Sequence, residues 1–268
     1  MTDQITYMDV AAATPVGLDY KRRSLAALDV RPGQTVVDIG CGPGTDLGRL
    51  AEAVGPGGLV IGIDRDPPML AEARRRGRGG GARGHGGEAR VREGDAGRGE
   101  GDVRLCEGDI HALPLAGASV DRARADRLLQ HVTDPQAAIA EVRRVLRPGG
   151  LFGMAEPDWD TLAVSDDDPG VSRAWSRFVA GRVRNPTIGR ELPRLCARAG
   201  LRVYSVEAVA VVFRDFDTAD RILGLRRNTE RAVQAGALLA AVGDAWVRRQ
   251  QSGPVLAGFT CYLVTAAR

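Results

Sequence analysis

The chain has 268 residues, of which 44% are hydrophobic and 26% are charged, and its formal net charge at pH 7 is +3. This composition is ordinary for a soluble globular protein, and the length suits one large domain or one domain with a cap. No stretch approaches the roughly 20 apolar residues of a membrane span, and the small net charge gives no reason to expect a nucleic-acid partner.

The N-terminal stretch MTDQITYMDVAAATPVG has no basic region and no long apolar run, so we expect no signal peptide and a cytoplasmic location. A helix is expected over residues 14–29. The β-branched run TVVDIG predicts a strand, and TDLGRLAEAV predicts a helix with Thr45 or Asp46 as its N-cap. A second strand (Leu59–Asp64) and a second helix (PPMLAEARRR) follow. This β-α-β-α order predicts a parallel sheet with helices on its faces.

Residues 77–102 are rich in glycine and arginine and have almost no apolar side chains. Such a segment cannot bury enough surface to offset its ordering entropy, so we interpret it as a flexible insertion. An arginine-glycine tail that binds nucleic acid is the alternative, although the acidic residues of the segment offset many of its arginines.

The alternation resumes after this segment. Val103–Asp109 is a predicted strand, and Arg122–Asp126 is a poor one because of its alternating arginines. DPQAAIAEVRRVLRPGG predicts a helix with an Asp-Pro start, and LFGMAEP predicts a fifth strand. From Asp158 the pattern changes to helical stretches over about 158–190 and 218–251, with strands over 201–213 and 257–268.

The stretch VVDIGCGPGTDL raises a chemical question, because an acidic residue and three glycines at alternate positions follow a buried strand. Ligands bind parallel sheets outside the carboxyl ends of the strands, and glycines allow close approach of the backbone. Asp64 ends the second strand, where its two oxygens could accept both hydroxyls of a ribose. The turn is GxGxG and not the dinucleotide fingerprint GxGxxG, and no P-loop is present. The pattern favours an adenosine-containing cofactor.

This stretch closely resembles motif I of the class I S-adenosylmethionine (SAM)-dependent methyltransferases of the small-molecule, UbiE-like type. The resemblance continues through GID at 62–64, GDIHALP at 108–114 and LRPGG at 146–150, in order and spacing. It implies an α/β fold: a Rossmann-like, seven-stranded, mostly parallel sheet with helices on both faces and a helical cap over the substrate site. The whole chain is then one methyltransferase domain whose SAM-binding core spans about 30–156.

The resemblance also implies roles for particular residues. The turn would let the backbone of Gly40, Cys41 and Gly42 approach the methionine part of SAM, with Asp38 near its ammonium end. Asp64 would hold the ribose. The other implied cofactor contacts are Arg65, Met69, Asp109 and Ile110 around the adenine, Asp126 and Arg127 at the methionine end, and Tyr20 and Lys21 on a helix that closes over SAM.

Methyl transfer needs alignment and exclusion of water more than protein chemistry, and a general base only where the nucleophile must lose a proton. His131 is the candidate base, with a structural or substrate-orienting role as the alternative. Glu156 and Asp158 follow the fifth strand and are candidate catalytic residues that could bind a cationic amine or take a proton, with a polar loop as the alternative. Trp159 and Arg190 are candidate substrate contacts.

The sequence leaves the acceptor open among carbon, oxygen and nitrogen. The motif [DNS]PP[YFW] of nucleobase amino-methylating enzymes is absent, since DRLLQHV follows the fourth strand. We therefore expect a small organic acceptor, from specialised or quinone-like metabolism, and a monomer or homodimer. The alternatives are a SAM-fold protein without methyl transfer and a macromolecule methyltransferase. The scattered cysteines and histidines show no metal-binding spacing, so no metal is expected.

Overall fold

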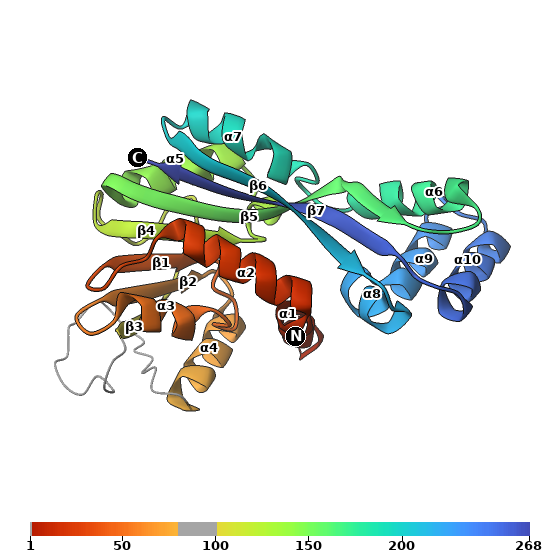
Figure 1. Cartoon of the computed structure of the whole chain (residues 1–268), viewed down its shortest axis with the longest axis horizontal. Helices are drawn as coiled ribbons and strands as arrows, with labels where there is room; N and C mark the ends of the chain where they lie inside the picture. Colours follow the sequence, from red (N-terminus) through yellow and green to blue (C-terminus); the bar gives the residue numbers. More distant parts are fainter. Residues whose placement is uncertain (1, 80–100) are drawn as a thin grey trace.

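The computed structural model describes residues 2–79 and 101–268 (Figure 1). Its elements in chain order are α1 (Thr2–Ala13), α2 (Pro15–Leu28), β1 (Thr35–Ile39), α3 (Leu47–Val54), β2 (Leu59–Asp64), α4 (Pro67–Gly79), β3 (Asp102–Glu107), β4 (Val120–Asp126), η1 (Leu129–His131), α5 (Pro135–Val145), β5 (Leu146–Val164), α6 (Pro169–Ala180), α7 (Ile188–Arg198), β6 (Arg202–Phe213), α8 (Phe216–Leu223), α9 (Leu225–Gln234), α10 (Ala240–Ser252) and β7 (Ala257–Ala267). Most of the predicted insertion at 77–102 lies outside the described residues.

The seven strands form one sheet in the order β3-β2-β1-β4-β5-β7-β6. Strands β3, β2, β1, β4 and β5 pair in parallel, and β7 pairs antiparallel with both β5 and β6. The predicted mostly parallel, seven-stranded sheet is therefore confirmed. Its strand order reverses between β1 and β4, and such a reversal opens a crevice at the carboxyl ends of the strands.

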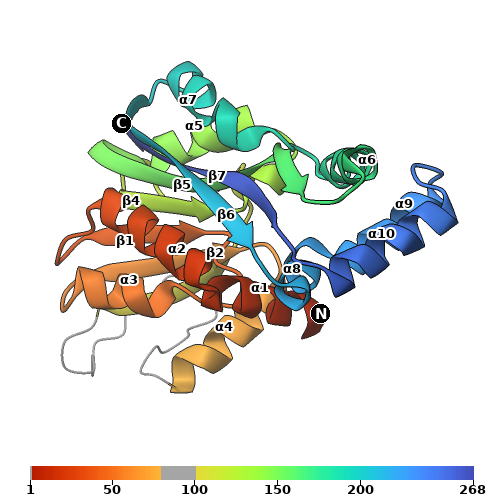
Figure 2. The same ribbon diagram turned by 45° about the vertical axis from the view of Figure 1, so that its right-hand side comes forward.

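Helices cover both faces of the sheet, as predicted (Figure 2). On one face, apolar side chains of α3 and α4 form a buried cluster with β1, β2 and β3, and Leu25 of α2 packs against it. On the other face, α5 and α7 pack on the central strands in a second cluster. Burial of apolar surface in these two clusters holds the helices against the sheet.

The strands β5, β6 and β7 extend well beyond the parallel part of the sheet and carry α6, α8, α9 and α10 at their far ends (Figure 1). A third cluster fills this region, and within it Trp175 stacks on Trp246 with ring centroids 5.2 Å apart. The sequence predicted a shorter fifth strand and one continuous helical stretch over 218–251. Instead, Gly224 and Gly236 adopt φ values of +66° and +72° and interrupt that stretch.

The arginines that made β4 a poor predicted strand are both buried and paired. Side chains two residues apart in a strand point to the same face, and Arg122 and Arg124 lie on the face covered by α2. The Nε of Arg122 donates to the carbonyl oxygen of Leu28 at 2.8 Å, which satisfies an otherwise free carbonyl at the end of α2. Arg124 binds carboxylates of the site described below.

Candidate functional site

The glycine turn follows β1 at the point where the strand order reverses. Gly40, Gly42 and Gly44 have φ values of +70°, +54° and +79°, a region that side chains disfavour. A Cβ on Gly40 would lie 2.9 Å from Leu128 Cδ1, and one on Gly44 would lie 3.1 Å from Ala73 Cβ. Both the backbone conformation and the tight packing therefore require glycine here.

Asp64 lies at the end of β2 and faces this turn. Its Oδ2 accepts a hydrogen bond from the N–H of Gly42 at 2.8 Å, and its Oδ1 accepts one from the N–H of Asp66 at 2.9 Å. The carboxylate thus fixes the turn relative to β2, and each oxygen retains a lone pair for another donor. Its predicted role at a ribose remains a prediction that this geometry permits.

The residues predicted around an adenine lie along the adjoining strand ends. Met69 and Ile110 are buried, whereas Arg65 and Asp109 are exposed. The Oδ1 of Asp109 accepts a hydrogen bond from the backbone N–H of His111 at 2.8 Å and also contacts the Nδ1 of its ring. These two hydrogen bonds lower the pKa of Asp109. The sequence did not indicate this role for His111, although it stands two residues after Asp109.

A buried charge cluster lies beneath the turn and consists of Lys21, Asp38, Asp46, Arg124 and Asp126. Arg124 donates to Asp38 at 2.8 Å, to Asp46 at 2.8 Å and to Asp126 at 2.9 Å. Lys21 donates to Asp126 at 2.9 Å and also to Asp46. Two cations and three carboxylates from four parts of the chain therefore pair with one another inside the protein.

This cluster changes several interpretations of the sequence. Asp46 stands at the N-cap position of α3 but makes no capping hydrogen bond, because its carboxylate binds Lys21 and Arg124. Lys21 is buried and donates to two carboxylates, and its predicted contact with SAM remains a prediction. Asp38 is buried, and its carboxylate accepts a hydrogen bond from Arg124. Tyr20 is also buried, and its hydroxyl donates to Asp126 at 3.2 Å.

The charges within the cluster shift the pKa values of its carboxyl groups in different directions. Burial alone would raise the pKa of Asp126, but Lys21 and Arg124 hold it well below its usual range. Burial also favours a higher pKa for Asp46, but the positive charges of Arg124 and Lys21 outweigh it, and the pKa of Asp46 is lowered. For Asp38 burial prevails, and the pKa is raised although Arg124 offsets part of the effect.

An apolar cavity of about 330 Å³ opens beside the carboxyl end of β4. Aromatic and aliphatic side chains make up most of its wall, with a few polar groups at one side. Its lining residues are Tyr7, Met8, Ala11, Thr14, Val16, Gly17, Tyr20, Asp126, Arg127, Gln130, His131, Pro157, Trp159, Val183, Val211, Phe213, Ile222, Phe259 and Cys261. Met8 also packs on Gly42, since a Cβ there would lie 3.3 Å from Met8 Cε. The cavity and the glycine turn are therefore neighbours.

His131 lies at the exposed mouth of this cavity, at the end of η1. Nearby protein atoms exclude enough water to lower the pKa of His131, and the positive charges of Arg65 and Arg127 lower it further. Its imidazole is therefore neutral near pH 7. Trp159 also lines the cavity, where its Nε1 donates to Gln130 Oε1 at 2.8 Å and its ring lies 4.8 Å from that of Phe259.

Glu156 and Asp158 do not reach the cavity, contrary to their predicted catalytic role. Glu156 is fully buried, and it accepts hydrogen bonds from the N–H groups of Leu128 and Leu129 at 2.8 and 2.6 Å and from that of Gln130 at 3.3 Å. Burial raises the pKa of Glu156 to about 8, although these hydrogen bonds oppose the rise. Glu156 thus positions the loop after β4.

Asp158 is likewise fully buried, and its carboxylate binds the guanidinium of Arg190. Arg190, predicted as a substrate contact, thereby links the start of α7 to β5, and it is not among the residues that line the cavity. Of the residues predicted around the substrate, the cavity brings together His131 and Trp159.

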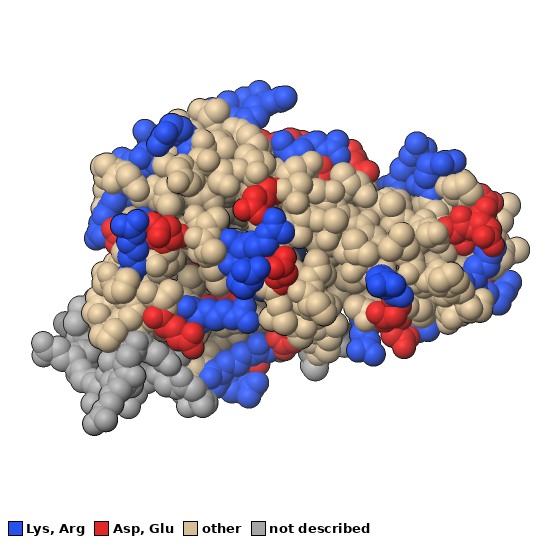
Figure 3. Space-filling view, in the orientation of Figure 1, with Lys and Arg blue, Asp and Glu red and all other residues tan. Residues whose placement is uncertain are grey.

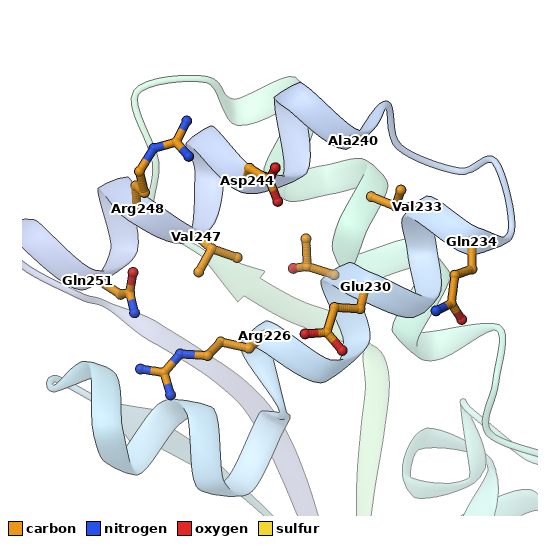
Figure 4. Close-up of a pocket in the computed structure, with 10 residues that line it drawn as sticks. Arg226, Glu230, Val233, Gln234, Ala240, Asp244, Val247, Arg248 and Gln251 are labelled. Atoms are coloured by element: carbon orange, nitrogen blue, oxygen red, sulfur yellow. The ribbon is translucent and has the colours of Figure 1, made fainter.

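The described residues also line hollows other than this cavity. A groove of about 760 Å³ between α1, α6, α8 and α9 shares Tyr7, Trp159 and Ile222 with the apolar cavity. A hollow of about 430 Å³ lies between α9 and α10 (Figure 4), where side chains of both charges line it, including Arg226, Glu230, Asp244 and Arg248. It contains none of the predicted site residues.

The described part of the chain gives three more findings. Basic and acidic side chains are interspersed over the described face drawn in Figure 3 and form no single basic surface there. Among residues 2–79 and 101–268, no cluster of three or more His, Cys, Asp or Glu side chains could hold a metal ion. Within the same ranges, no helix combines the length and apolar character needed to cross a membrane.

Comparisons with known proteins agree with this architecture. A family model described as a methyltransferase domain matches residues 31–200. An uncharacterized 37.1 kDa protein in transposon TN4556 of Streptomyces fradiae is 48% identical over 265 residues, which cover 98% of this chain and 71% of that protein. The ubiquinone/menaquinone biosynthesis C-methyltransferase UbiE of Acidiphilium cryptum is 31% identical over 233 residues, which cover 85% and 79% of the two chains. The solved structure of the YcgJ protein of Bacillus subtilis matches with a TM-score of 0.62 at 17% identity and covers 92% of this chain and 98% of that chain.

Proposed function

We propose that this chain, which belongs to the class I SAM-dependent methyltransferases, methylates a small organic acceptor that binds in the apolar cavity. The observation that carries the proposal is the position of this cavity, beside the glycine turn and at the carboxyl end of β4. A cavity of about 330 Å³ is in the range of sites for small ligands. The relative UbiE, a quinone-pathway C-methyltransferase by name, supports an acceptor from specialised or quinone-like metabolism.

The residues at the turn fit SAM. The positive φ values of Gly40 and Gly42 leave the backbone free of side chains where the methionine part would approach. Asp64 has lone pairs left for ribose hydroxyls, and Met69 and Ile110 offer apolar surface for an adenine. When bound, SAM supplies an activated methyl group to a nucleophile.

The protein's own contribution is to orient the acceptor and exclude water. The aromatic wall formed by Trp159 and Phe259 supplies a rigid apolar surface against which a planar acceptor can lie. His131 is neutral near pH 7 and makes no side-chain hydrogen bond within the described part of the chain, so it can accept a proton from an acceptor hydroxyl. We therefore retain His131 as the proposed base and withdraw Glu156 and Asp158.

Calorimetric titration with SAM tests the first half of the proposal. We expect Asp64→Ala to weaken SAM binding at least tenfold, because charge-assisted hydrogen bonds contribute about 1.5–3 kcal/mol each. Asp167→Ala, which removes an exposed carboxylate remote from the turn, should leave the affinity unchanged. Absence of SAM binding to the unaltered protein would instead favour a SAM-fold protein without methyl transfer.

Methyl transfer from radiolabelled SAM to a panel of small phenols, carboxylic acids and quinols tests the second half. If His131 is the base, His131→Ala should lower kcat by about 10²–10⁴-fold and abolish the fall in kcat at low pH. A raised KM with an unchanged pH profile would assign His131 to acceptor orientation. Methylation of RNA or protein, with no turnover of the small-molecule panel, would replace the proposal by a macromolecule methyltransferase.

A further inference from the structure

Most polar groups that line the apolar cavity already have partners within the protein. The hydroxyl of Tyr20 donates to Asp126 at 3.2 Å. Gln130 accepts from Trp159 at 2.8 Å and donates to the carbonyl oxygen of Arg127 at 3.1 Å. Thr14 accepts from the N–H of Gly17 at 3.0 Å and donates to the carbonyl of Ala11. These groups are therefore not free to recognise a ligand.

Arg127 is different, because its charged side chain lines the cavity without a hydrogen-bonded partner. Within the described part of the chain its guanidinium makes no hydrogen bond, and its buried Nε has none. The nearest carboxylate oxygen, Asp126 Oδ1, lies 3.6 Å from that Nε, beyond hydrogen-bond distance. The guanidinium carbon lies 6.0 Å from the centre of the Tyr7 ring, so the wall beside it is aromatic.

Asp126 cannot compensate Arg127 fully, since the same carboxylate already accepts from Tyr20, Lys21 and Arg124. A guanidinium remains charged at all working pH values and carries five N–H donors. Only 21% of the Arg127 side chain is exposed, and burying such a group without hydrogen bonds is unfavourable. A ligand that carries acceptor oxygens into the cavity would relieve this cost.

The backbone holds Arg127 in place. Its φ of +54° lies in the left-handed region, which is costly for a residue with a side chain. The N–H of Arg127 donates to the carbonyl of Ala155 at 2.8 Å, and the next three N–H groups donate to Glu156. The guanidinium is thus carried on a rigid loop, which lowers the cost of ordering it around a ligand.

We propose that Arg127 determines acceptor specificity by binding a carboxylate, so that the acceptor is an apolar carboxylic acid whose hydrocarbon body lies against Trp159 and Phe259. The two oxygens of a carboxylate match the paired donors of a guanidinium. The inference rests on the proposed function and narrows its acceptor class. It also reassigns Arg127, which the sequence resemblance placed beside the methionine end of SAM.

The test compares two ligands of nearly the same shape, 2-naphthoate and uncharged 2-naphthamide, by calorimetry in the presence of saturating S-adenosylhomocysteine. We expect the unaltered protein to bind naphthoate at least tenfold more tightly than naphthamide. Arg127→Met, which keeps an unbranched apolar stem and a side chain at the same positive φ, should abolish this preference and retain naphthamide binding. Arg127→Lys should restore part of it, because a lysine keeps the charge but loses the paired donors.

Arg221→Met is the matched control, since Arg221 is an exposed arginine of the adjoining groove. This variant should keep the preference for naphthoate. Equal binding of the two ligands to the unaltered protein, or loss of the preference in Arg221→Met with retention in Arg127→Met, would overturn the inference.

Titration of the same variants with SAM separates the inference from the proposed function. SAM affinity should be unchanged in Arg127→Met. A parallel loss of SAM binding would show that Arg127 holds the carboxylate of SAM, which overturns the inference and leaves the methyltransferase proposal intact. If the unaltered protein binds naphthoate with the expected preference but binds no SAM, the proposed function fails and the anion site stands by itself.

Discussion

Replacement of Arg124 by methionine tests whether the buried charge cluster stabilises the fold. Arg124 is 2% exposed and donates to three carboxylates at 2.8, 2.8 and 2.9 Å. Methionine fills a similar volume but carries neither charge nor donors. Lys21 continues to compensate Asp46 and Asp126, so the greatest loss falls on Asp38, which binds no other cation directly among the described residues.

The expected loss at pH 7 is about 3–5 kcal/mol of unfolding free energy, the typical cost of leaving a buried charge without its partner. The cost depends on pH in a definite direction. In the unaltered protein the pKa values of Asp46 and Asp126 are lowered, so their contribution to stability is present above pH ~4 and is lost as the pH falls. Without Arg124 the carboxyl pKa values rise. The folded variant then binds more protons than its unfolded chain, and its stability falls as the pH increases.

Urea unfolding followed by circular dichroism at pH 5, 6, 7 and 8 measures both effects. The difference between the variant and the unaltered protein should be smallest at pH 5 and largest at pH 8. Arg22→Met is the control, because Arg22 pairs with Asp19 on the exposed surface of α2, and it should leave the unfolding free energy unchanged. A loss below about 1 kcal/mol at pH 7, or an equal loss at pH 5 and 8, would refute the reasoning.

Three further predictions concern the turn, the loop after β4 and the far end of the sheet. Gly40→Ala should lower both stability and SAM affinity, because Gly40 has a positive φ and a Cβ there would contact Leu128. Gly33→Ala, at φ +82° with no neighbour near the added Cβ, should lower stability alone. Thermal unfolding and SAM titration distinguish the two variants. Glu156→Ala leaves three N–H groups without their acceptor and should lower the melting temperature together with activity; a drop in activity without any loss of stability would restore a catalytic role for Glu156. Trp175→Ala should cost about 3–5 kcal/mol of unfolding free energy with SAM affinity retained, and weakened SAM binding in the folded variant would contradict this separation.

The parallel core of the fold could be predicted from the sequence because its signals are local. A β-branched run, a glycine turn and an amphipathic helix specify a strand-turn-helix unit within about 20 residues, and the unit recurs along the chain. The positive φ values of Gly40, Gly42 and Gly44 follow from the same stretch that first indicated a cofactor. The strand ends also place Asp64 and Asp109 at one edge of the sheet, as parallel pairing requires.

The chemistry within the site depended on tertiary structure. Lys21, Asp46 and Arg124 are distant in sequence, and nothing local indicates that they meet or that Asp46 gives up a helix cap to bind two cations. Glu156 was a candidate catalytic residue because it stands at the end of a predicted strand, but its direction is set by the N–H groups of Leu128, Leu129 and Gln130, which are 26 to 28 residues earlier.

The surroundings of Arg127 could not be predicted from the sequence either. The sequence placed it correctly after the fourth strand, but only the packing of α1, β6 and β7 around it made an apolar cavity lined by a guanidinium that has no hydrogen bond among the described residues. The sequence determined the sheet and the position of the site at its edge, because hydrophobic periodicity and glycine conformations act over short stretches. Which charges are paired and which are left free was decided by the tertiary structure, because hydrogen bonding and desolvation depend on every group within a few ångströms, whatever its place in the chain.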